Sequence, residues 1–388
     1  DALPILLTIP NAWNVSFNEI PGLPDKLITE NIPSSVDSKV YSVPELTLEN
    51  TYNDGNVRRI KLENSGEKYY LLDKVNNNAK IYNPNHSLWK TVSLPKPINA
   101  SYADIDVISE TQLNPDALLE IGYAYSETVS NSTQYEAKIV NENNLVLLTV
   151  PNSSRLQISS LEGLQDKLMA DIYLSSFPLN SSSNIYNLPS LSLENTYESH
   201  ISRIKLENSD EKYFTDYKPL NNQLKIYNSN HTLWKTINLP VFVNNGIDPI
   251  HYLSETKINT DALIEFSYTY ATGLLGEGSE YSSRVINENG DVLLENNYLG
   301  NLFLNEIAGL QNKLIGYIYY YGHDAYVGKV YSLETLGTFD YNKNNKVIIS
   351  PNPARSFLNI ISLSSKVIEA TIYNINGVLV KRETRSEE

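Results

Sequence analysis

Three pairs of acidic residues carry the functional group that glycosidic chemistry requires. A glycoside hydrolase holds two carboxyl groups at a fixed separation across the scissile bond. In this chain the acids recur at matching places in two similar stretches: Glu110 and Glu255, Asp116 and Asp261, and Glu120 and Glu265. A structural repeat rarely carries a catalytic pair in every copy, so we expect capping and turn roles, with Asp116 and Asp261 in Asx turns. The sequence predicts no catalytic residue.

Histidine and asparagine residues in the repeated turns are the candidate metal ligands. His86 and His231 occupy matching turns, NPNHSLW and NSNHTLW, and neither has a second histidine or a carboxylate at ligand spacing. The turns Asn141–Asn143 and Asn287–Asn289, the latter with Asp291, offer oxygen atoms that suit calcium. They lack the ligand density of a calcium loop, so hairpin turns are expected. We expect no metal site and no cofactor, and calcium is the one ion that the sequence leaves open.

Aromatic residues are the best candidates for binding. Trp89 and Trp234 occupy matching positions, each followed by Lys-Thr, and either pack between strands or form a stacking platform for a sugar or partner. The run at 317–321 (YIYYY) breaks strict alternation, so some of its tyrosines must face outward. An ordinary aromatic-rich strand is the alternative. The candidate binding residues are Trp89, Trp234, Tyr317, Tyr319, Tyr320 and Tyr321.

A long internal repeat must position these side chains. Residues 61–95 and 205–240 share KLENS, EKY, KIYN and LWKT, and Lys61 and Lys205 are 205 − 61 = 144 positions apart. Ser109 and Ser254 are 254 − 109 = 145 apart. Each repeat divides into three segments, A (58–95), B (103–150) and C (155–194), and each segment has four strand-like runs separated by Asn, Gly, Ser and Pro.

The segments follow one another in the order C, A, B, C, A, B, C. Seven four-stranded units of roughly 40–50 residues are typical of a β-propeller. We therefore predict an all-β, propeller-like ring of about seven blades over residues 1–340, with internal repeats at 47–190 and 191–335. A string of tandem β-sandwiches, one per repeat of ~145 residues, is the alternative. Helical content should be low.

One strand-like run stands apart from the seven segments. Ile5–Pro10 (ILLTIP) precedes the first C segment and matches the last strand of segment B, LVLLTVP at Leu145–Pro151. It is either a clasp that completes the final blade or the remainder of an earlier unit.

Composition limits the class of protein. The 388 residues are 41% hydrophobic, include no cysteine and carry a formal net charge of −15. An acidic chain disfavours a nucleic-acid partner, because phosphate binding needs a basic face. No apolar run is long enough to span a membrane. The chain starts without a signal peptide, so we expect that one was removed or that the sequence begins mid-protein.

The last 48 residues differ in composition from the repeat, and they contain a recognisable set of motifs. These are Ser350-Pro351-Asn352-Pro353, the alternating strand Phe357–Ile361, the apolar strand Ala370–Asn374, and Asn376-Gly377 before Val378–Val380. The set resembles the C-terminal sorting domain of proteins exported by the type IX secretion system of Bacteroidetes. The family continues to a further glycine-containing strand and a basic end, whereas this chain ends KRETRSEE. Residues 341–388 therefore resemble a truncated sorting domain.

This resemblance implies a small, here partial, β-sandwich tail, contact with the type IX machinery through Pro351, Asn352, Pro353 and Gly377, and a place outside the cell or on the outer-membrane surface. The chain also has 28 tyrosines against 8 phenylalanines, and tyrosine is frequent at contact surfaces. Together with the repeat and this tyrosine excess, the resemblance favours a non-catalytic binding or adhesion module with a glycan or protein ligand. A structural, self-associating subunit of an extracellular assembly is the alternative. A polysaccharide-active enzyme ranks third and would need a non-repeated carboxylate pair, with the insertion Thr272–Tyr281 as the place to look.

Overall fold

The computed structural model describes 8–9, 12–31, 37–130, 132–173, 181–216, 222–239, 247–259, 261, 263–272, 280–297, 299–307, 310–319, 326–333, 347–350, 359–362, 369–373 and 379–384. Antiparallel strands make up nearly all the regular structure of this part. It includes no helix with the length and apolar character needed to cross a bilayer.

Seven antiparallel sheets follow one another along the chain, and each takes its strands in sequence order. The first, fourth and seventh sheets correspond to segment C. Their strands are β1 (Ala12–Asn18), β2 (Lys26–Asn31), β3 (Ser38–Ser42) and β4 (Leu48–Tyr52); β13 (Ser153–Ser159), β14 (Lys167–Tyr173), β15 (Ser181–Asn187) and β16 (Ser192–Tyr197); and β25 (Leu299–Asn305), β26 (Lys313–Tyr319) and β27 (Tyr326–Ser332).

The other four sheets correspond to segments A and B. The A-type strands are β5 (Arg58–Leu62), β6 (Gly66–Asp73), β7 (Asn78–Tyr82) and β8 (Leu88–Ser93), then β17 (Ile201–Leu206), β18 (Asp210–Thr215), β19 (Gln223–Asn228) and β20 (Leu233–Asn238). The B-type strands are β9 (Ser101–Ser109), β10 (Glu120–Val129), β11 (Ser132–Asn141) and β12 (Val146–Pro151), then β21 (Ile247–Ser254), β22 (Glu265–Thr272), β23 (Glu280–Asn287) and β24 (Val292–Asn297).

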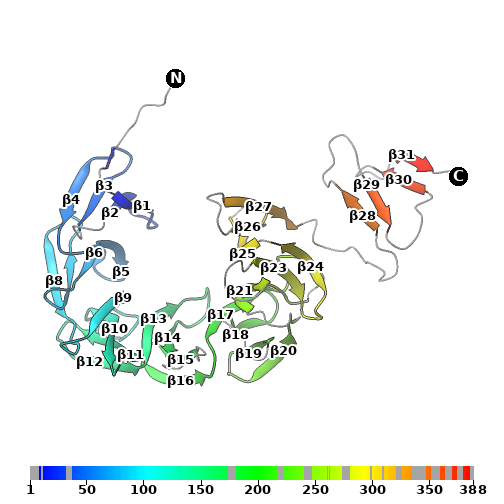
Figure 1. Cartoon of the computed structure of the whole chain (residues 1–388). Helices are drawn as coiled ribbons and strands as arrows, with labels where there is room; N and C mark the ends of the chain where they lie inside the picture. Colours follow the sequence, from blue (N-terminus) through cyan, green and yellow to red (C-terminus); the bar gives the residue numbers. More distant parts are fainter. Residues whose placement is uncertain are drawn as a thin grey trace.

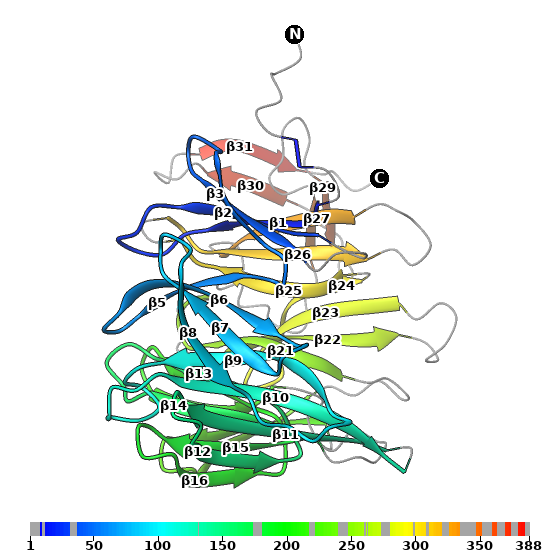
Figure 2. The same cartoon turned by 90° about the vertical axis from the view of Figure 1, so that its left-hand side faces the viewer.

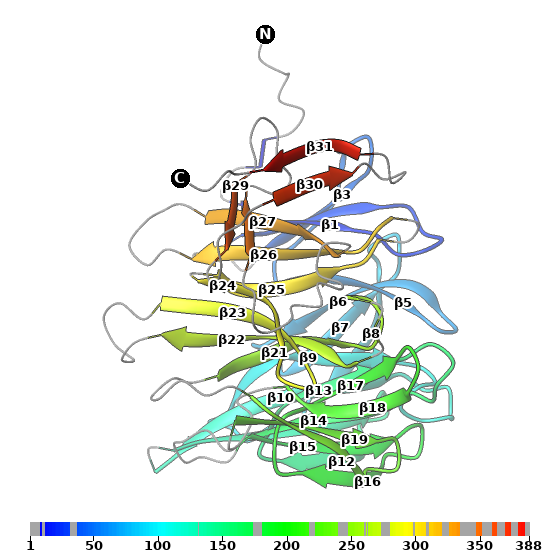
Figure 3. The same cartoon turned by 90° about the vertical axis from the view of Figure 1, so that its right-hand side faces the viewer.

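The seven sheets stand around a common centre, with the first strand of each towards the middle (Figure 1). The propeller-like ring and the order C, A, B, C, A, B, C are thereby confirmed, and the chain is not a string of sandwiches. The ring is open between the first and seventh sheets (Figure 1). In the side views both sheets are in the upper half, below the tail strands (Figures 2 and 3). The seventh sheet has three described strands, and Ile5–Pro10 lies mostly outside the described residues.

The described residues beyond 346 form four short strands, which pair as two two-stranded sheets. They are β28 (Val347–Ser350) with β29 (Asn359–Ser362), and β30 (Glu369–Tyr373) with β31 (Leu379–Thr384). The predicted sandwich tail is thus seen as two hairpin-like pairs, and the boundary at 340/341 stays a prediction.

The hydrophobic core is divided into six clusters, one between each pair of consecutive sheets. Strand β6 shows why, because neighbouring residues of the strand enter different clusters. Tyr69 and Leu71 pack against the first sheet, whereas Tyr70 and Leu72 pack against the third. Successive strand residues point to opposite faces, so the apolar run YYLL is what a sheet covered on both sides requires.

A buried arginine joins each C-type sheet to the A-type sheet that follows it. The guanidinium of Arg59 has no exposed side-chain surface and donates to Glu67 Oε1 at 2.7 Å. It also donates to the carbonyl oxygens of Asn18 at 3.2 Å and Pro24 at 2.7 Å in the preceding sheet. Arg203 repeats this arrangement with Glu211, Ser159 and Gln165.

A reciprocal pair of glutamates joins each A-type sheet to the B-type sheet that follows. Glu110 Oε2 accepts the backbone N–H groups of Asn64 at 2.8 Å and Ser65 at 2.9 Å. In return, Glu63 accepts the backbone N–H of Glu110 at 2.8 Å and the hydroxyl of Ser109 at 2.9 Å. We call this arrangement the glutamate clasp. It explains why KLENS and SET recur together, since Glu255 and Glu207 form the same contacts with the turn at Asn208 and with Ser254.

We predict that Glu110→Ala destabilises the protein by about 2–4 kcal/mol, because two partly buried backbone N–H groups and the Ser65 hydroxyl lose their charged acceptor. Chemical denaturation measures the change. Glu45→Ala is the matched control, because Glu45 is exposed in the turn before β4. Equal unfolding midpoints for the two variants would contradict the role of the clasp.

Candidate functional site

The two repeated tryptophans lie between lysines at the edge of the clusters that join A- and B-type sheets. The Trp89 ring has Lys68 Nζ 4.8 Å and Lys90 Nζ 4.3 Å from its centre. Lys212 and Lys235 lie 4.8 and 4.6 Å from the centre of the Trp234 ring. Both indoles are partly buried against the neighbouring apolar side chains. Cation–π contact of this kind stabilises the folded sheet, and stacking on a ligand remains a prediction.

Of the tyrosine run, Tyr317 is the residue whose side chain the structure describes. It is 52% exposed on β26, and its ring centre lies 6.4 Å from that of Phe303. Phe303 in turn lies 5.6 Å from His251. Tyr320 and Tyr321 lie outside the described residues, as do the side chain of Tyr319 and the sorting-motif residues Pro351, Asn352, Pro353 and Gly377.

The repeated aspartates and asparagines are used in turns. Asp116 Oδ1 accepts the backbone N–H of Leu118 at 3.0 Å, and Asp261 does the same for Leu263. Asn141 Oδ1 accepts backbone N–H groups within its own hairpin, which directs the oxygen away from any ion. No cluster of three or more acidic or histidine side chains suited to a metal is found in the part of the chain that the structure describes.

His86 and His231 also lie in turns, as the sequence predicts. Both adopt positive φ angles, 63° and 65°. The Nδ1 atom of His86 is 2.8 Å from the hydroxyl of Tyr52 in the preceding sheet, and that of His231 is 2.6 Å from Tyr197. These histidines therefore connect sheets and are not free to act on a ligand.

Glu120 and Glu265 are buried carboxyl groups, each 0% exposed. As a carboxylate, Glu120 would have no hydrogen-bond donor among the described residues. Burial, together with the neighbouring Asp116 and Asp261, raises their pKa values to about 8 and about 9. Both glutamates are therefore neutral acids at pH 7, and each can donate a hydrogen bond to the adjacent aspartate. Their repetition marks them as parts of the fold.

The places where the two copies differ are more informative about function. Four charged residues lie on the innermost strands of the second to fourth sheets, where the second copy has uncharged residues or histidine. They are Arg58, Asp104, Asp106 and Arg155, and their counterparts are Ser202, Pro249, His251 and Asn301. The surrounding sequence is repeated, so these differences are not required by the fold.

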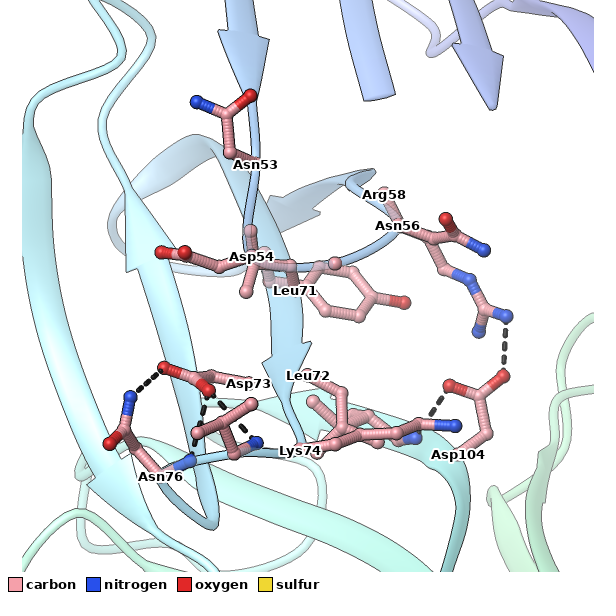
Figure 4. A pocket seen from close by; sticks show the side chains of 14 residues that line it. Asn53, Asp54, Asn56, Arg58, Leu71, Leu72, Asp73, Lys74, Asn76 and Asp104 are labelled. Carbon is pink, nitrogen blue, oxygen red and sulfur yellow. Dashed lines mark hydrogen bonds and ion pairs between the residues drawn. The ribbon is translucent and has the colours of Figure 1, made fainter. Parts of the chain in front are cut away.

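A pocket of about 550 Å³ opens beside these residues, between the second and third sheets. The loop before β5, the end of β6 with its turn, and β9 line it (Figure 4). The Arg58 guanidinium and the Asp104 carboxylate form an ion pair at one side. At the other side Asp73 accepts N–H groups of Val75 and Asn76 and pairs with Lys80, which lowers its pKa to about 2 against the effect of its burial.

A second pocket of about 550 Å³ shares Arg58, Tyr70 and Asp104 with the first and continues along β9 to Arg155 of β13. Asp106 lies in it and accepts the backbone N–H of Leu156 at 2.9 Å. Burial, together with the nearby carboxylates of Asp104 and Asp171, raises the pKa of Asp106 to about 6. The two pockets share residues and form a continuous surface, which we call the inner site.

The second copy has an ion triad near the corresponding place. His200 contacts Asp171 and Asp216, and Ser202 donates to Asp216. Burial alone would lower the pKa of His200, but the two carboxylates raise it to about 10. A histidine that stays protonated at neutral pH cannot act as a general base. Ser202 also donates its hydroxyl hydrogen to Asp216, whereas the serine of a hydrolytic triad donates to the histidine.

The inner site has no local signature in the sequence alone. Arg58 and Asp104 come from different sheets and are 46 positions apart, so no local motif unites them. A usable signal was present, because Arg58 interrupts an otherwise repeated stretch: RRIKLENS in the first copy becomes SRIKLENS in the second.

Known proteins resemble this chain only distantly. No protein-family model and no curated protein matches the chain. Similar solved structures include the Dos1 propeller (10% identity, TM-score 0.43, covering 80% of this chain and 75% of that one) and BamB from Moraxella catarrhalis (10%, 0.41, 79% and 79%). A protein of unknown function from Bacteroides caccae is another (10%, 0.29, 71% and 94%). With TM-scores below 0.5, the ring assignment rests on the sheet order and the six clusters.

We predict that stability falls as pH rises from about 4.5 to about 9, because the folded state keeps the protons of Glu120 and Glu265 while the unfolded state loses them. The double variant Glu120→Gln, Glu265→Gln should weaken this dependence, leaving the part due to the raised pKa of His200, and should raise the melting temperature above that of wild type at pH 8. Thermal unfolding between pH 5 and 9 measures both effects. Glu45→Gln is the control, and parallel profiles for all three proteins would refute the prediction.

Proposed function

We propose that this chain is a non-catalytic binding module, secreted or held at a cell surface, and that the inner site binds its ligand. The observation that carries the proposal is the charged set at Arg58, Asp104, Asp106 and Arg155, which one copy of the repeat has and the other lacks. A repeat that is only structural has no need for this difference. Binding surfaces are commonly placed on rigid frameworks of this kind.

The chemistry of the inner site suits an uncharged ligand with many hydroxyl groups, such as a glycan. Arg58 is paired with Asp104, and Lys80 with Asp54 and Asp73, so the lining carries little unbalanced charge. Carboxylate, amide, guanidinium and phenol groups together offer both donors and acceptors at short range. A hydroxyl group needs both, whereas a strongly charged ligand would meet a group of its own sign.

Aromatic residues of the sixth and seventh sheets supply a second contact surface. His251, Phe303 and Tyr317 form a connected row. Figure 1 places β9 and β21, the innermost strands of the two B-type sheets, on opposite sides of the ring. An extended glycan that contacts the inner site and this row would use polar groups on one side and ring faces on the other.

We predict that Arg58→Ser and Asp106→His each weaken glycan binding at least about tenfold, because each removes charged hydrogen bonds from the inner site. The variants install the residues that the second copy already has, Ser202 and His251, so the fold should tolerate them. A glycan array followed by titration calorimetry, with and without calcium, measures binding. Ser202→Ala is the matched control. Unchanged affinity in both variants, or the absence of any glycan bound by the wild-type protein, would contradict the proposal.

Hydrolysis of a glycan is a second candidate function, favoured by one observation. Asp104 and Asp106 are a non-repeated carboxylate pair in the same pocket, and their environments differ, since Asp104 pairs with Arg58 while the pKa of Asp106 is raised to about 6. An acid with a raised pKa near a second carboxylate that is held in an ion pair is an arrangement that glycosidases use. Release of reducing ends from a bound glycan, lost in Asp106→Asn, would establish this activity and replace the binding proposal.

Export by a type IX route is the third part of the proposal, and the motif set at 350–380 supports it. Behind a signal peptide in a type IX-competent bacterium, the chain should reach the surface or medium. A variant that lacks 341–388 should stay in the periplasm, because the sorting motifs are gone. Cell fractionation and surface proteolysis measure this, and a host without the secretion system is the control. Equal export of both chains would contradict the route.

A further inference from the structure

One face of the first sheet is partly exposed, and its counterpart is covered in both other C-type sheets. Thr29 and Tyr41, which lie opposite Val15 and Leu27 on this face, are themselves 0% and 6% exposed. Val15 on β1 is 52% exposed, whereas the residues at the same position, Leu156 and Leu302, are each 1% exposed. Leu27 is partly exposed, and its counterparts Leu168 and Leu314 are 0% exposed. Phe17, 53% exposed, extends the surface. We call Val15, Phe17 and Leu27 the open face.

The fourth and seventh sheets show what kind of partner covers the corresponding face. In the fourth sheet, Leu156 and Leu168 pack on Ala124, Ala137 and Ile139 of the B-type sheet before it. In the seventh sheet, Leu302 and Leu314 pack on Val285 of the other B-type sheet. Both known occupants are therefore B-type sheets, and the apolar residues that they contact are retained in the first sheet.

The first sheet also retains the acidic residues that bind a B-type sheet. Asp166 accepts from the side chain of Gln112 at 3.2 Å, and Glu306 accepts from Lys257 at 3.0 Å. Gln112 and Lys257 occupy the same place after the SET motif. Asp25 and Glu19 stand at the positions of Asp166 and Glu306, and their side chains have no hydrogen-bond or ion-pair partner among the described residues. The open face thus has both acceptors and lacks their donors.

The sequence before β1 fits the same partner. Ile5–Pro10 matches the outermost B-type strand with a constant offset: Pro151 and Pro10 differ by 151 − 10 = 141, and so do Leu156 and Val15 (156 − 15 = 141). Another copy of this chain cannot supply its own B-type sheets, because the faces concerned are already covered by the fourth and seventh sheets.

We propose that the open face docks a further B-type sheet, which lies before β1 in the same polypeptide and has Ile5–Pro10 as its outermost strand. The partner is a four-stranded antiparallel sheet with small and branched apolar residues on its inner face. It carries a glutamine or lysine after its SET-like turn, which donates to Asp25 and Glu19. This interface is separate from the inner site and does not depend on the proposed function.

The chain has no cysteine, so a single introduced thiol reports directly on the open face. In the chain as it stands, Val15→Cys should react rapidly with a maleimide, and Leu156→Cys should react slowly. Mass spectrometry at several protein concentrations measures both rates. Slow labelling of a Val15→Cys monomer would mean that the chain covers its own face. Slow labelling at high concentration alone would mean that a second copy does. Either result overturns the proposal.

A second experiment adds a B-type sheet in front of the chain. A copy of residues 98–141 placed directly before Asp1 puts Ile5–Pro10 where β12 normally follows. In this extended chain, labelling of Val15→Cys should slow by at least about tenfold, to the rate of Leu156→Cys. Asp25→Ala should restore part of the lost rate. The matched control carries a copy of the A-type residues 54–97 instead and should label rapidly.

The proposal fails if the B-type extension leaves labelling fast, whether or not the extension is folded, because the open face and Ile5–Pro10 should together be enough to hold it. It also fails if the A-type extension protects Val15→Cys equally, since the open face would then have no preference for the partner type.

Discussion

Every inner sheet of this ring has two apolar faces, and no such sheet can be stable in water alone. Strand β6 illustrates the constraint, since Tyr69 and Tyr70 are neighbours in sequence and yet pack against different sheets. The free energy that holds the fold is therefore located between sheets. A sheet folds stably when both neighbours are in place, which makes the order of the sheets as important as their internal pairing.

Apolar layers alone would not set that order, because one layer of branched side chains packs nearly as well on another. The polar contacts at the layer edges differ between interface types. Arg59 requires carbonyl groups of a C-type loop, and Glu110 requires the N–H groups of an A-type turn. A wrong neighbour would leave these groups buried and unpaired, at a cost of several kcal/mol. We infer that such contacts select the neighbour while the apolar layers supply most of the stability.

Much of this architecture could be predicted from the sequence. Alternation within short runs predicts strands, and the repeat predicts their grouping and order. The turn roles of Asp116 and His86 follow from recurrence in both copies. The inner site could not be predicted, because Arg58 and Asp104 meet only when two sheets pack. The partners of Trp89 were missed for a related reason, since Lys68 reaches the indole across the sheet from β6. Tertiary pairing of this kind has no periodic signal.

Three interface types that follow one another in a fixed cycle restrict how such a chain can change its length. Loss or gain of one sheet would place two sheets of the wrong types next to each other. An interface arginine would then lack its acceptor, or an interface glutamate its donor. Removal or duplication of three consecutive sheets would keep every junction as it is. Insertions and deletions among natural variants should therefore come in steps of about 145 residues, the spacing of the present repeat. The polar contacts that hold the ring together thus also set the unit of its evolutionary growth.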